Sequence, residues 1–194
     1  MVTTKQRYTF EDWLELPDDG RRYELLNGDL VEMAPPTANH ALLVSALDRW
    51  FGRAEAAGHG SGIVGPVAVL LDAAMRRENA PEPDVLFVRR GREQIITAEA
   101  VEGVPDLVIE ILSPSNRKDD LPGGEKWKLY RSFGVPSYWT VDPATRTITQ
   151  YERHAGQLVE TGRLGLGEEL VSPLFPGITL PVAELFQSLR ESRR

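Results

Sequence analysis

Residues 105–115 read PDLVIEILSPS, and the rest of the chain is organised around this stretch. Its centre is rich in branched apolar residues, which is typical of a buried strand, and the Ser-Pro pair predicts a turn after it. Side chains alternate between the two faces of a strand, so Leu107 and Ile109 share one face while Val108 and Glu110 share the other. A strand that is apolar on both faces is a central strand, covered above and below.

Glu110 is the one charged side chain inside this apolar run. A buried, ionised carboxylate is costly unless it is paired with a cation or bound to a metal. A structural role is the alternative, in which Glu110 lies at the strand end and reaches water or pairs with an arginine. Glu110 is therefore the first candidate for a functional residue.

Length and composition indicate a globular protein. The chain has 194 residues, of which 41% are hydrophobic and 26% are charged, so we expect residues 1–194 to form a single domain. It has no cysteine, which excludes disulfides, thiolate metal sites and a cysteine nucleophile, and fits a reducing compartment. No apolar run approaches the roughly 20 residues that cross a bilayer. Residues 1–7 lack the apolar segment of a signal peptide, so we expect a cytoplasmic protein without a membrane partner.

The net charge of −7 limits the nucleic-acid functions that the chain could have. Nonspecific binding to phosphates needs a cationic surface, so a general nucleic-acid coat protein is disfavoured. An enzyme with a local basic rim around an acidic metal site remains compatible with this charge.

Local patterns predict both helices and strands. Thr9 is predicted to cap a short helix, and Asn27-Gly28 between two alternating runs predicts a hairpin over residues 23–33. Apolar residues at helical spacing predict a long helix over residues 39–57. Further helices are predicted at 124–133 and 182–189, and strands at 67–71, 83–88, 137–141, 147–151, 157–160, 169–172 and 178–180. The strand at 147–151 is predicted to be an exposed antiparallel strand, and residues 58–62 are predicted to end the long helix. Residues 72–82 and 116–124 are predicted to be loops, residues 91–104 a loop with a short helical turn, and residues 190–194 a charged tail.

Asp84 is the second carboxylate in a core-type strand, directly after Pro83. Taken alone, this pair is an ordinary turn that opens a strand. Asp84 together with Glu110 is more informative, because two carboxylates on neighbouring strands repel each other unless a cation lies between them. Oxygen-only ligands favour Mg²⁺ or Mn²⁺, with waters completing the coordination shell.

A hydrolytic metal site also benefits from a nearby cationic side chain, which orients the attacking water or stabilises developing charge. A lysine two residues after Glu110 would serve, but that position is Leu112. Lys126 is the better candidate, because it shares a helical stripe with three apolar residues, whereas Lys128 should face solvent. The three apolar residues of this stripe are Leu129, Tyr130 and Phe133. The alternative is that Lys126 extends its ammonium into water.

Several motifs, in this order and spacing, resemble the Uma-type putative restriction endonuclease family, which belongs to the PD-(D/E)XK nuclease superfamily. The resemblance covers about residues 8 to 187. It rests on the segments 23–30, 83–85, 107–115 and 134–142, and on Lys126 followed by Leu129 and Tyr130. It implies an α/β (α+β mixed) restriction-endonuclease-like fold, with a mixed central sheet flanked by helices, an N-terminal hairpin and Mg²⁺-dependent phosphodiester hydrolysis.

The resemblance also implies a role for each candidate residue. Asp84 and Glu110 match the two acids of the family, and Lys126 matches a lysine moved from the strand onto the following helix. Glu24 matches an additional acid from the N-terminal hairpin. His40 matches a histidine at the start of the long helix, where it would contact phosphate or be only a polar residue at the helix start.

The chain departs from the family pattern in its loop before Lys126. Residues 119–124 read DDLPGG, and this Pro-Gly-Gly stretch could shift the register and leave Lys118 or Lys128 as the catalytic lysine. Ser137 also stands where the family often has an acid.

These residues predict a metal-dependent DNA endonuclease. We expect Asp84, Glu110 and the backbone carbonyl of Ile111 to hold Mg²⁺ or Mn²⁺, Lys126 to position or deprotonate the water, and Glu24 to complete the acidic pocket. A homodimer would suit cleavage of both strands of a duplex. The alternatives are a noncatalytic member of the same fold, acting as a binding or assembly module, and a hydrolase of RNA or another phosphodiester.

Overall fold

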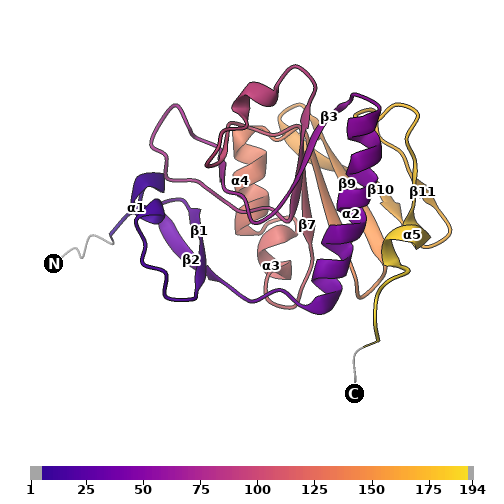
Figure 1. The fold of residues 1–194 in the computed structure, drawn as a ribbon, viewed down its shortest axis with the longest axis horizontal. Helices are drawn as coiled ribbons and strands as arrows, with labels where there is room; N and C mark the ends of the chain where they lie inside the picture. The colour runs from indigo at the N-terminus through magenta and orange to yellow at the C-terminus, as the bar shows by residue number, and fades with distance from the viewer. Residues whose placement is uncertain (1–5, 192–194) are drawn as a thin grey trace.

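The strand predicted at the centre of the chain is β7 (Leu107–Ile111), and all of its residues are buried. It lies in a six-stranded sheet with the order β10-β9-β8-β7-β5-β3, shown by a computed structural model that describes residues 6–191 (Figure 1). β7 pairs parallel with β8 (Ser137–Asp142) and antiparallel with β5 (Val85–Arg89), which makes the sheet mixed. The other strands of this sheet are β3 (Gly60–Val64), β9 (Thr147–His154) and β10 (Gln157–Leu164). The prediction of a buried central strand is confirmed.

Three smaller strand pairs and several helices complete the described residues. The strand pairs are β1 (Arg22–Leu26) with β2 (Asp29–Met33), β4 (Val69–Leu70) with β6 (Val101–Glu102), and β11 (Glu169–Leu170) with β12 (Leu180–Pro181). The helices are α1 (Phe10–Leu14), α2 (Ala38–Ala56), the 3₁₀ turn η1 (Glu93–Ile95), α3 (Arg117–Asp120), α4 (Glu125–Phe133) and α5 (Val182–Phe186). Within residues 6–191, no helix is long and apolar enough to cross a membrane. Most of the polar N-terminus and of the charged tail lies outside the described residues.

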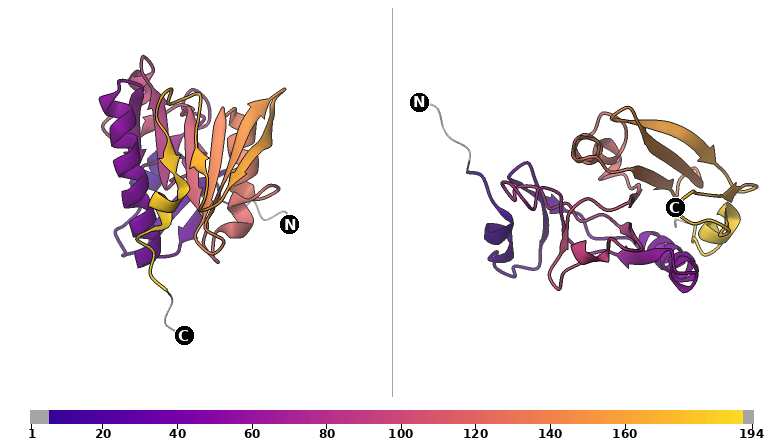
Figure 2. Two further views of the ribbon diagram at one scale, coloured as in Figure 1. Left: turned by 90° about the vertical axis from the view of Figure 1, so that its right-hand side faces the viewer. Right: turned by 90° about the horizontal axis from the view of Figure 1, so that it is seen from above.

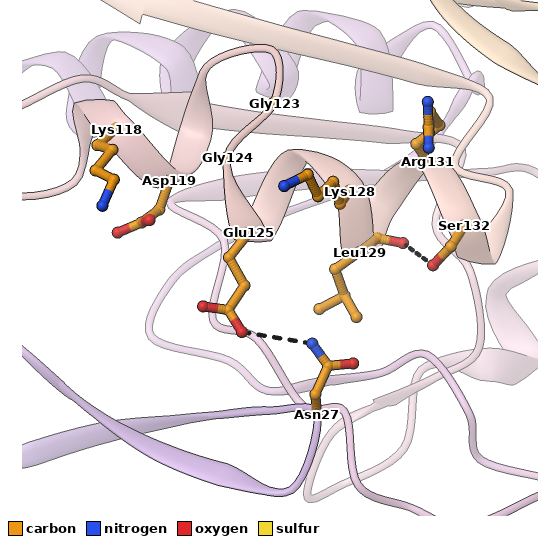
Figure 3. Close-up of a pocket in the computed structure, with 10 residues that line it drawn as sticks. All are labelled: Asn27, Lys118, Asp119, Gly123, Gly124, Glu125, Lys128, Leu129, Arg131 and Ser132. Carbon is orange, nitrogen blue, oxygen red and sulfur yellow. Dashed lines mark hydrogen bonds between the residues drawn. The ribbon is translucent and has the colours of Figure 1, made fainter.

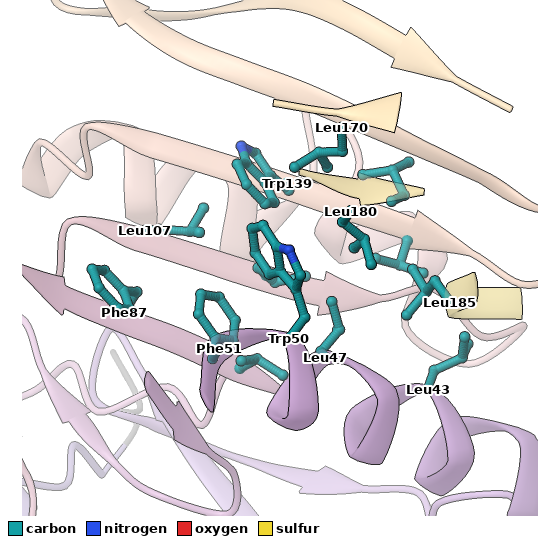
Figure 4. Close-up of a cluster of buried hydrophobic side chains, with 14 of the residues drawn as sticks. Leu43, Leu47, Trp50, Phe51, Phe87, Leu107, Trp139, Leu170, Leu180 and Leu185 are labelled. Carbon is teal, nitrogen blue, oxygen red and sulfur yellow. The ribbon is translucent and has the colours of Figure 1, made fainter. Parts of the chain in front are cut away.

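The long helix α2 covers one face of the sheet. Its Trp50 and Phe51 are buried in a large apolar cluster that also contains Leu107 and Ile109 of β7 (Figure 4). Phe175, from the C-terminal segment, closes this cluster with ring centroids 4.9 Å from Trp50 and 5.5 Å from Phe51. This face of β7 is therefore a dry, aromatic core.

Helix α4 covers the opposite face, as the views along the sheet show (Figure 2). Leu129 and Tyr130 of α4 belong to a second apolar cluster, which includes Val108 of β7 and Tyr138 of β8. Glu110 shares its face of β7 with Val108, so its side chain points into the layer between the sheet and α4. The fold thus places the Glu110 carboxylate beside the apolar cluster between the sheet and α4.

Two local signals in the sequence act as predicted. Thr9 and Asp12 form a reciprocal capping box at the start of α1. The β1–β2 hairpin turns at Asn27 and Gly28, which have φ angles of 50° and 74°, as a two-residue turn of the primed type requires. α2 also begins and ends within one residue of the predicted limits.

The edge strand β3 was not predicted, because residues 58–62 were expected only to end α2, whereas residues 60–64 pair with β5. The glycines of β3 give no sequence signal for a strand, because glycine has a low strand propensity. A Cβ atom at Gly62 would lie 2.7 Å from the Cβ of Phe51, so α2 packs too closely for a larger residue. Long-range packing therefore selects glycine here against local preference.

Three other segments also depart from their predictions. Only Val69–Leu70 of the predicted strand at 67–71 is extended, and it pairs with β6 instead of joining the large sheet. The strand at 147–151 lies inside the sheet between β8 and β10, so the prediction of an exposed strand is wrong. The loop predicted at 116–124 contains the short helix α3.

Replacing Gly62 tests the close packing of α2 on β3. Gly62→Ala should lower the free energy of unfolding by roughly 1–3 kcal/mol, because the new methyl group overpacks against Phe51. Gly52→Ala, within α2, meets nothing within 4 Å and should stabilise the protein by up to about 1 kcal/mol through helix propensity. Urea unfolding of both variants measures the difference, and equal stabilities would contradict this account of β3.

Candidate active site

A groove of about 710 Å³ runs between the β1–β2 hairpin, the start of α2 and the end of β7. All the side chains that the sequence singles out for the site line it: Glu24, His40, Asp84, Glu110 and Lys126. They come from five separate parts of the chain, and the fold brings them to one place. We refer to this hollow as the central groove.

Lys126 connects two acids of the central groove. Its side chain is buried, with 5% of the residue exposed, and its ammonium Nζ lies 2.8 Å from Oε1 of Glu24 and 2.8 Å from Oε1 of Glu110. The helical stripe predicted from the sequence therefore turns Lys126 inward, and Lys128 is exposed. A hairpin strand, a central strand and a helix meet at one ammonium group.

Glu110 is almost fully buried and accepts a second hydrogen bond on the same oxygen. The hydroxyl of Tyr130 donates to Oε1 at 2.9 Å. Burial raises the pKa of Glu110 well above its ordinary value, Lys126 offsets part of this effect, and the carboxylates of Asp120 and Asp84 add to the increase. The sequence pattern did not single out Tyr130 as a partner of Glu110, although it lies on the same helical stripe as Lys126.

Asp84 directly precedes β5 and lies next to Glu110. Extending the antiparallel register of β5 and β7 by one residue places Asp84 opposite Glu110. The backbone N–H of Ile111 donates to Oδ2 of Asp84 at 2.7 Å. His40 Nε2 lies 3.1 Å from the other oxygen, Oδ1, and α2 presents it from its first turn. Asp84 is thus oriented from both sides.

Glu24 fastens the hairpin to the rest of the central groove. Its Oε1 accepts the backbone N–H of Glu82 at 2.9 Å, in addition to the contact with Lys126. Glu82 in turn pairs with Arg22 of the same hairpin strand at 2.6 Å. The hairpin is therefore tied to the segment that leads into β5.

The loop after β7 is closed by Asn116, which the sequence analysis missed. Asn116 Nδ2 donates to the carbonyl oxygen of Ile111 at 3.1 Å, and its Oδ1 accepts from the N–H and hydroxyl of Ser113 at 2.6 and 2.9 Å. A carbonyl oxygen has two lone pairs, so the oxygen of Ile111 keeps one for a further interaction. Asn116 thereby fixes the direction of this carbonyl.

Asp120 is a buried acid that no sequence pattern revealed. It is 0% exposed, and within residues 6–191 neither side-chain oxygen has a hydrogen-bond partner. Burial raises its pKa to about 7, although Lys126 acts in the opposite direction. The carboxylates of Glu24 and Asp84 raise it further. The layer under α4 therefore contains more acidic groups than the one lysine pairs with.

The two other candidate lysines line a different hollow. Lys118 and Lys128 border a depression of about 630 Å³ on the outer side of α3 and α4 (Figure 3). Asn27 at the hairpin tip reaches this depression and donates to Glu125 at 3.5 Å. Of the three lysines considered, Lys126 lines the central groove in the described part of the chain.

The donor groups of the central groove suit a hard cation that keeps several waters. Within residues 6–191 there is no group of three or more acidic, histidine or cysteine side chains poised to hold a metal. Asp84, Glu110 and the Ile111 carbonyl nevertheless form the kind of oxygen-only set that binds Mg²⁺ with one or two carboxylates. Asp84 lies opposite Glu110 across β5 and β7, so a cation between these neighbouring carboxylates would relieve their mutual repulsion. The residues present therefore fit such an ion.

A family model described as "Putative restriction endonuclease" matches residues 10–183 of this chain. The chain belongs to the Uma2 family. This confirms the resemblance found in the sequence, and membership of the Uma2 family supports nuclease activity in general. No curated protein matches the sequence.

A solved structure extends the comparison to the fold. The chain is similar to a protein from Anabaena variabilis described as a putative nuclease belonging to DUF820, with a TM-score of 0.73 and 16% sequence identity. The similarity covers 93% of this Uma2 chain and 98% of the other. It confirms the predicted architecture, a central mixed sheet flanked by helices.

Asp120 should make stability depend on pH. In the folded state its pKa is about 7, against about 4 when unfolded, so between these values the native protein binds more protons and its stability falls as pH rises. Asp120→Asn has no titrating group at this position, so its stability should not fall with pH in this way. The free energy of unfolding of the variant, relative to the wild type, should therefore rise by up to about 4 kcal/mol between pH 4 and pH 8.

Urea unfolding of both proteins across this pH range measures the difference. Groups that titrate in both proteins largely cancel in the comparison. A difference in stability that is constant with pH would show that Asp120 is ionised, and stabilised, in the folded protein.

Proposed function

We propose that this Uma2 protein is a metal-dependent endonuclease that hydrolyses phosphodiester bonds of DNA. The observation that carries the proposal is the convergence of Asp84, Glu110 and Lys126 in one groove. Two acids that can hold a metal and a lysine that can stabilise developing charge are a combination that metal-assisted hydrolysis can use. The description of the family as a restriction endonuclease supports DNA as the substrate.

Asp84, Glu110 and the carbonyl of Ile111 would hold Mg²⁺ or Mn²⁺. When bound, such an ion polarises the phosphodiester and lowers the pKa of a coordinated water. The N–H of Ile111 and the imidazole of His40 hold the Asp84 carboxylate in place, and Asn116 holds the carbonyl. The ligands are therefore oriented before any ion arrives.

Lys126 would act as a donor. Burial alone would lower its pKa, but the carboxylates of Glu110, Glu24 and Asp120 outweigh burial and raise the pKa well above its ordinary value. A lysine that stays protonated has no lone pair with which to accept a proton. Of the two roles expected from the sequence, the structure therefore supports positioning the water and stabilising phosphoryl charge over deprotonating the water.

Further residues and a second copy of the chain extend this proposal. Glu24 would complete the acidic pocket by anchoring Lys126, and His40 would contact a substrate phosphate when it is not engaged with Asp84. Two copies of the chain would provide one central groove for each strand of a duplex. The lack of cysteine supports function in a reducing compartment such as the cytoplasm.

A noncatalytic binding or assembly module is the second candidate. The ion pairs of Lys126 with Glu24 and Glu110 already satisfy much of the charge in the central groove without a ligand. The net charge of −7 also disfavours strong binding of nucleic acid. In this case the acids and the lysine would hold β1, β7 and α4 together and have no further role.

Cleavage of plasmid DNA tests the catalytic proposal. The wild type should cleave in the presence of Mg²⁺ and lose cleavage when the ion is chelated. Glu110→Gln keeps the shape and the acceptor for Tyr130 but removes the charge, so the rate should fall by at least about 100-fold. The control, Glu99→Gln, changes an exposed acid outside the central groove and should cleave like the wild type. Unchanged cleavage by Glu110→Gln would refute the assigned site.

Calorimetric titration with Mn²⁺ separates the two candidates without relying on activity. The wild type and Glu99→Gln should bind Mn²⁺ alike, and Asp84→Asn should bind at least about 10-fold more weakly because it loses a charged ligand. If the wild type binds no Mn²⁺ at millimolar concentration, the noncatalytic module is the better description.

A further inference from the structure

Asp120 is an acid whose side chain the local structure leaves unused. Its backbone is well held at the end of α3, where its N–H donates to the carbonyl of Asn116 at 3.1 Å and its own carbonyl accepts the hydroxyl of Tyr138 at 2.8 Å. The carboxylate is 0% exposed, and neither oxygen has a partner in the described residues. An unpaired buried carboxylate costs free energy and calls for a functional explanation.

The sheet places Asp120 beside the acids of the central groove. In the register of β7 and β8, Val108 lies opposite Tyr138 and Glu110 opposite Thr140, so Tyr138 and Glu110 share a face of the sheet. The ring of Tyr130, which donates to Glu110, lies 5.5 Å from that of Tyr138, which donates to Asp120. The two tyrosines therefore connect Glu110 to Asp120 under α4.

Asp120 does not itself face the substrate side. The residues that line the central groove include Glu24, Glu110 and Lys126, whereas Asp120 is fully buried and is not among them. It cannot touch a substrate or a hydrated ion there. Any role in the reaction must pass through a neighbouring side chain.

Lys126 is the side chain through which Asp120 could act on the reaction. An ammonium group has three N–H donors, and two of them are accounted for by Glu24 and Glu110. Lys126 is also the one basic group among the strongest electrostatic influences on Asp120 in the described structure. Asp120 ends α3 and Lys126 lies in the first turn of α4, so a buried lysine with a spare donor and a buried carboxylate with two spare acceptors both lie at the junction of the two helices.

We propose that Asp120 is a positioning residue that receives the ammonium of Lys126 when Glu110 turns to a divalent cation. This inference rests on the proposed function and deepens it. In the structure Lys126 contacts Oε1 of Glu110, and a cation on that carboxylate would repel the nearby ammonium. Turning toward Asp120 keeps Lys126 paired, charged and anchored to Glu24. It also pairs the buried carboxylate of Asp120.

A crystal structure of metal-free Glu110→Gln tests the exchange itself. This variant removes the charge that holds Lys126 on β7, so Lys126 Nζ should lie within hydrogen-bond distance of an Asp120 oxygen. The control structure, Glu99→Gln, should keep both contacts of Lys126. If Lys126 in Glu110→Gln still contacts residues 24 and 110 and leaves Asp120 unpaired, the proposal is overturned. This result does not depend on nuclease activity.

A double-mutant cycle on Mn²⁺ affinity tests the consequence. Asp120→Asn should weaken Mn²⁺ binding by at least about 10-fold, because Lys126 then keeps competing for Glu110. In the Lys126→Met background the same substitution should change affinity by less than about 3-fold, since no ammonium needs a new partner. Equal effects in the two backgrounds would mean that Asp120 acts only through its charge, and would refute the positioning role.

The two tests separate this inference from the proposed function. A wild type that binds Mn²⁺ and cleaves DNA, with additive substitutions, contradicts the positioning role alone. A wild type that binds no Mn²⁺ contradicts the proposed function, and the structure of Glu110→Gln still decides whether Asp120 accepts Lys126. Thermal unfolding of each variant first establishes that it is folded, and the crystal test does not need Asp120→Asn to fold.

Discussion

The structure depends on one buried ammonium group, that of Lys126, held between the carboxylates of Glu24 and Glu110. Removing these charges from water is costly, and their mutual attraction repays the cost only when the geometry is good. The contact joins the N-terminal hairpin, the central strand and α4, which are distant in the sequence. Losing one partner would leave a buried charge uncompensated, typically at a cost of about 3–5 kcal/mol. Well-packed apolar residues often stabilise a fold as much as such buried ion pairs do, so the presence of these pairs in a groove favours a functional explanation.

Because Lys126 comes from helix α4 and not from the strand, the loop before α4 must bring the start of this helix close to the groove. Leu112, where a lysine would have followed Glu110 on the strand, is buried and donates its N–H to β8. The lysine must therefore come from α4, which packs on the face of the sheet that carries Glu110. The Pro-Gly-Gly stretch makes this possible, because a Cβ atom at Gly124 would lie 2.3 Å from the carbonyl oxygens of Lys118 and Asp119. The stretch that suggested a shifted register is the tight connection that brings α3 and α4 together.

In the layer under α4, the acidic groups outnumber the single lysine. Glu24, Glu110 and Asp120 act on one lysine, Lys126, and burial raises the pKa of both Glu110 and Asp120. A hard cation would correct the imbalance, and so would protonation of one acid. Tyr130 and Tyr138 help to fix this layer, because their hydroxyls donate to the Glu110 carboxylate and to the Asp120 backbone carbonyl.

The sequence by itself determined the features that depend on neighbouring residues. The primed turn at Asn27 and Gly28, the length of α2, the double-sided burial of β7 and the inward direction of Lys126 all follow from local conformational preference or from periodicity. Because periodicity identifies a buried face, it also marked Glu110 as out of place. Only the tertiary structure decided what that carboxylate contacts. Hydrogen bonds from Tyr130 and Asn116, the glycine-rich strand β3 and the unpaired Asp120 arise from packing between distant segments, for which a single sequence carries no local signal.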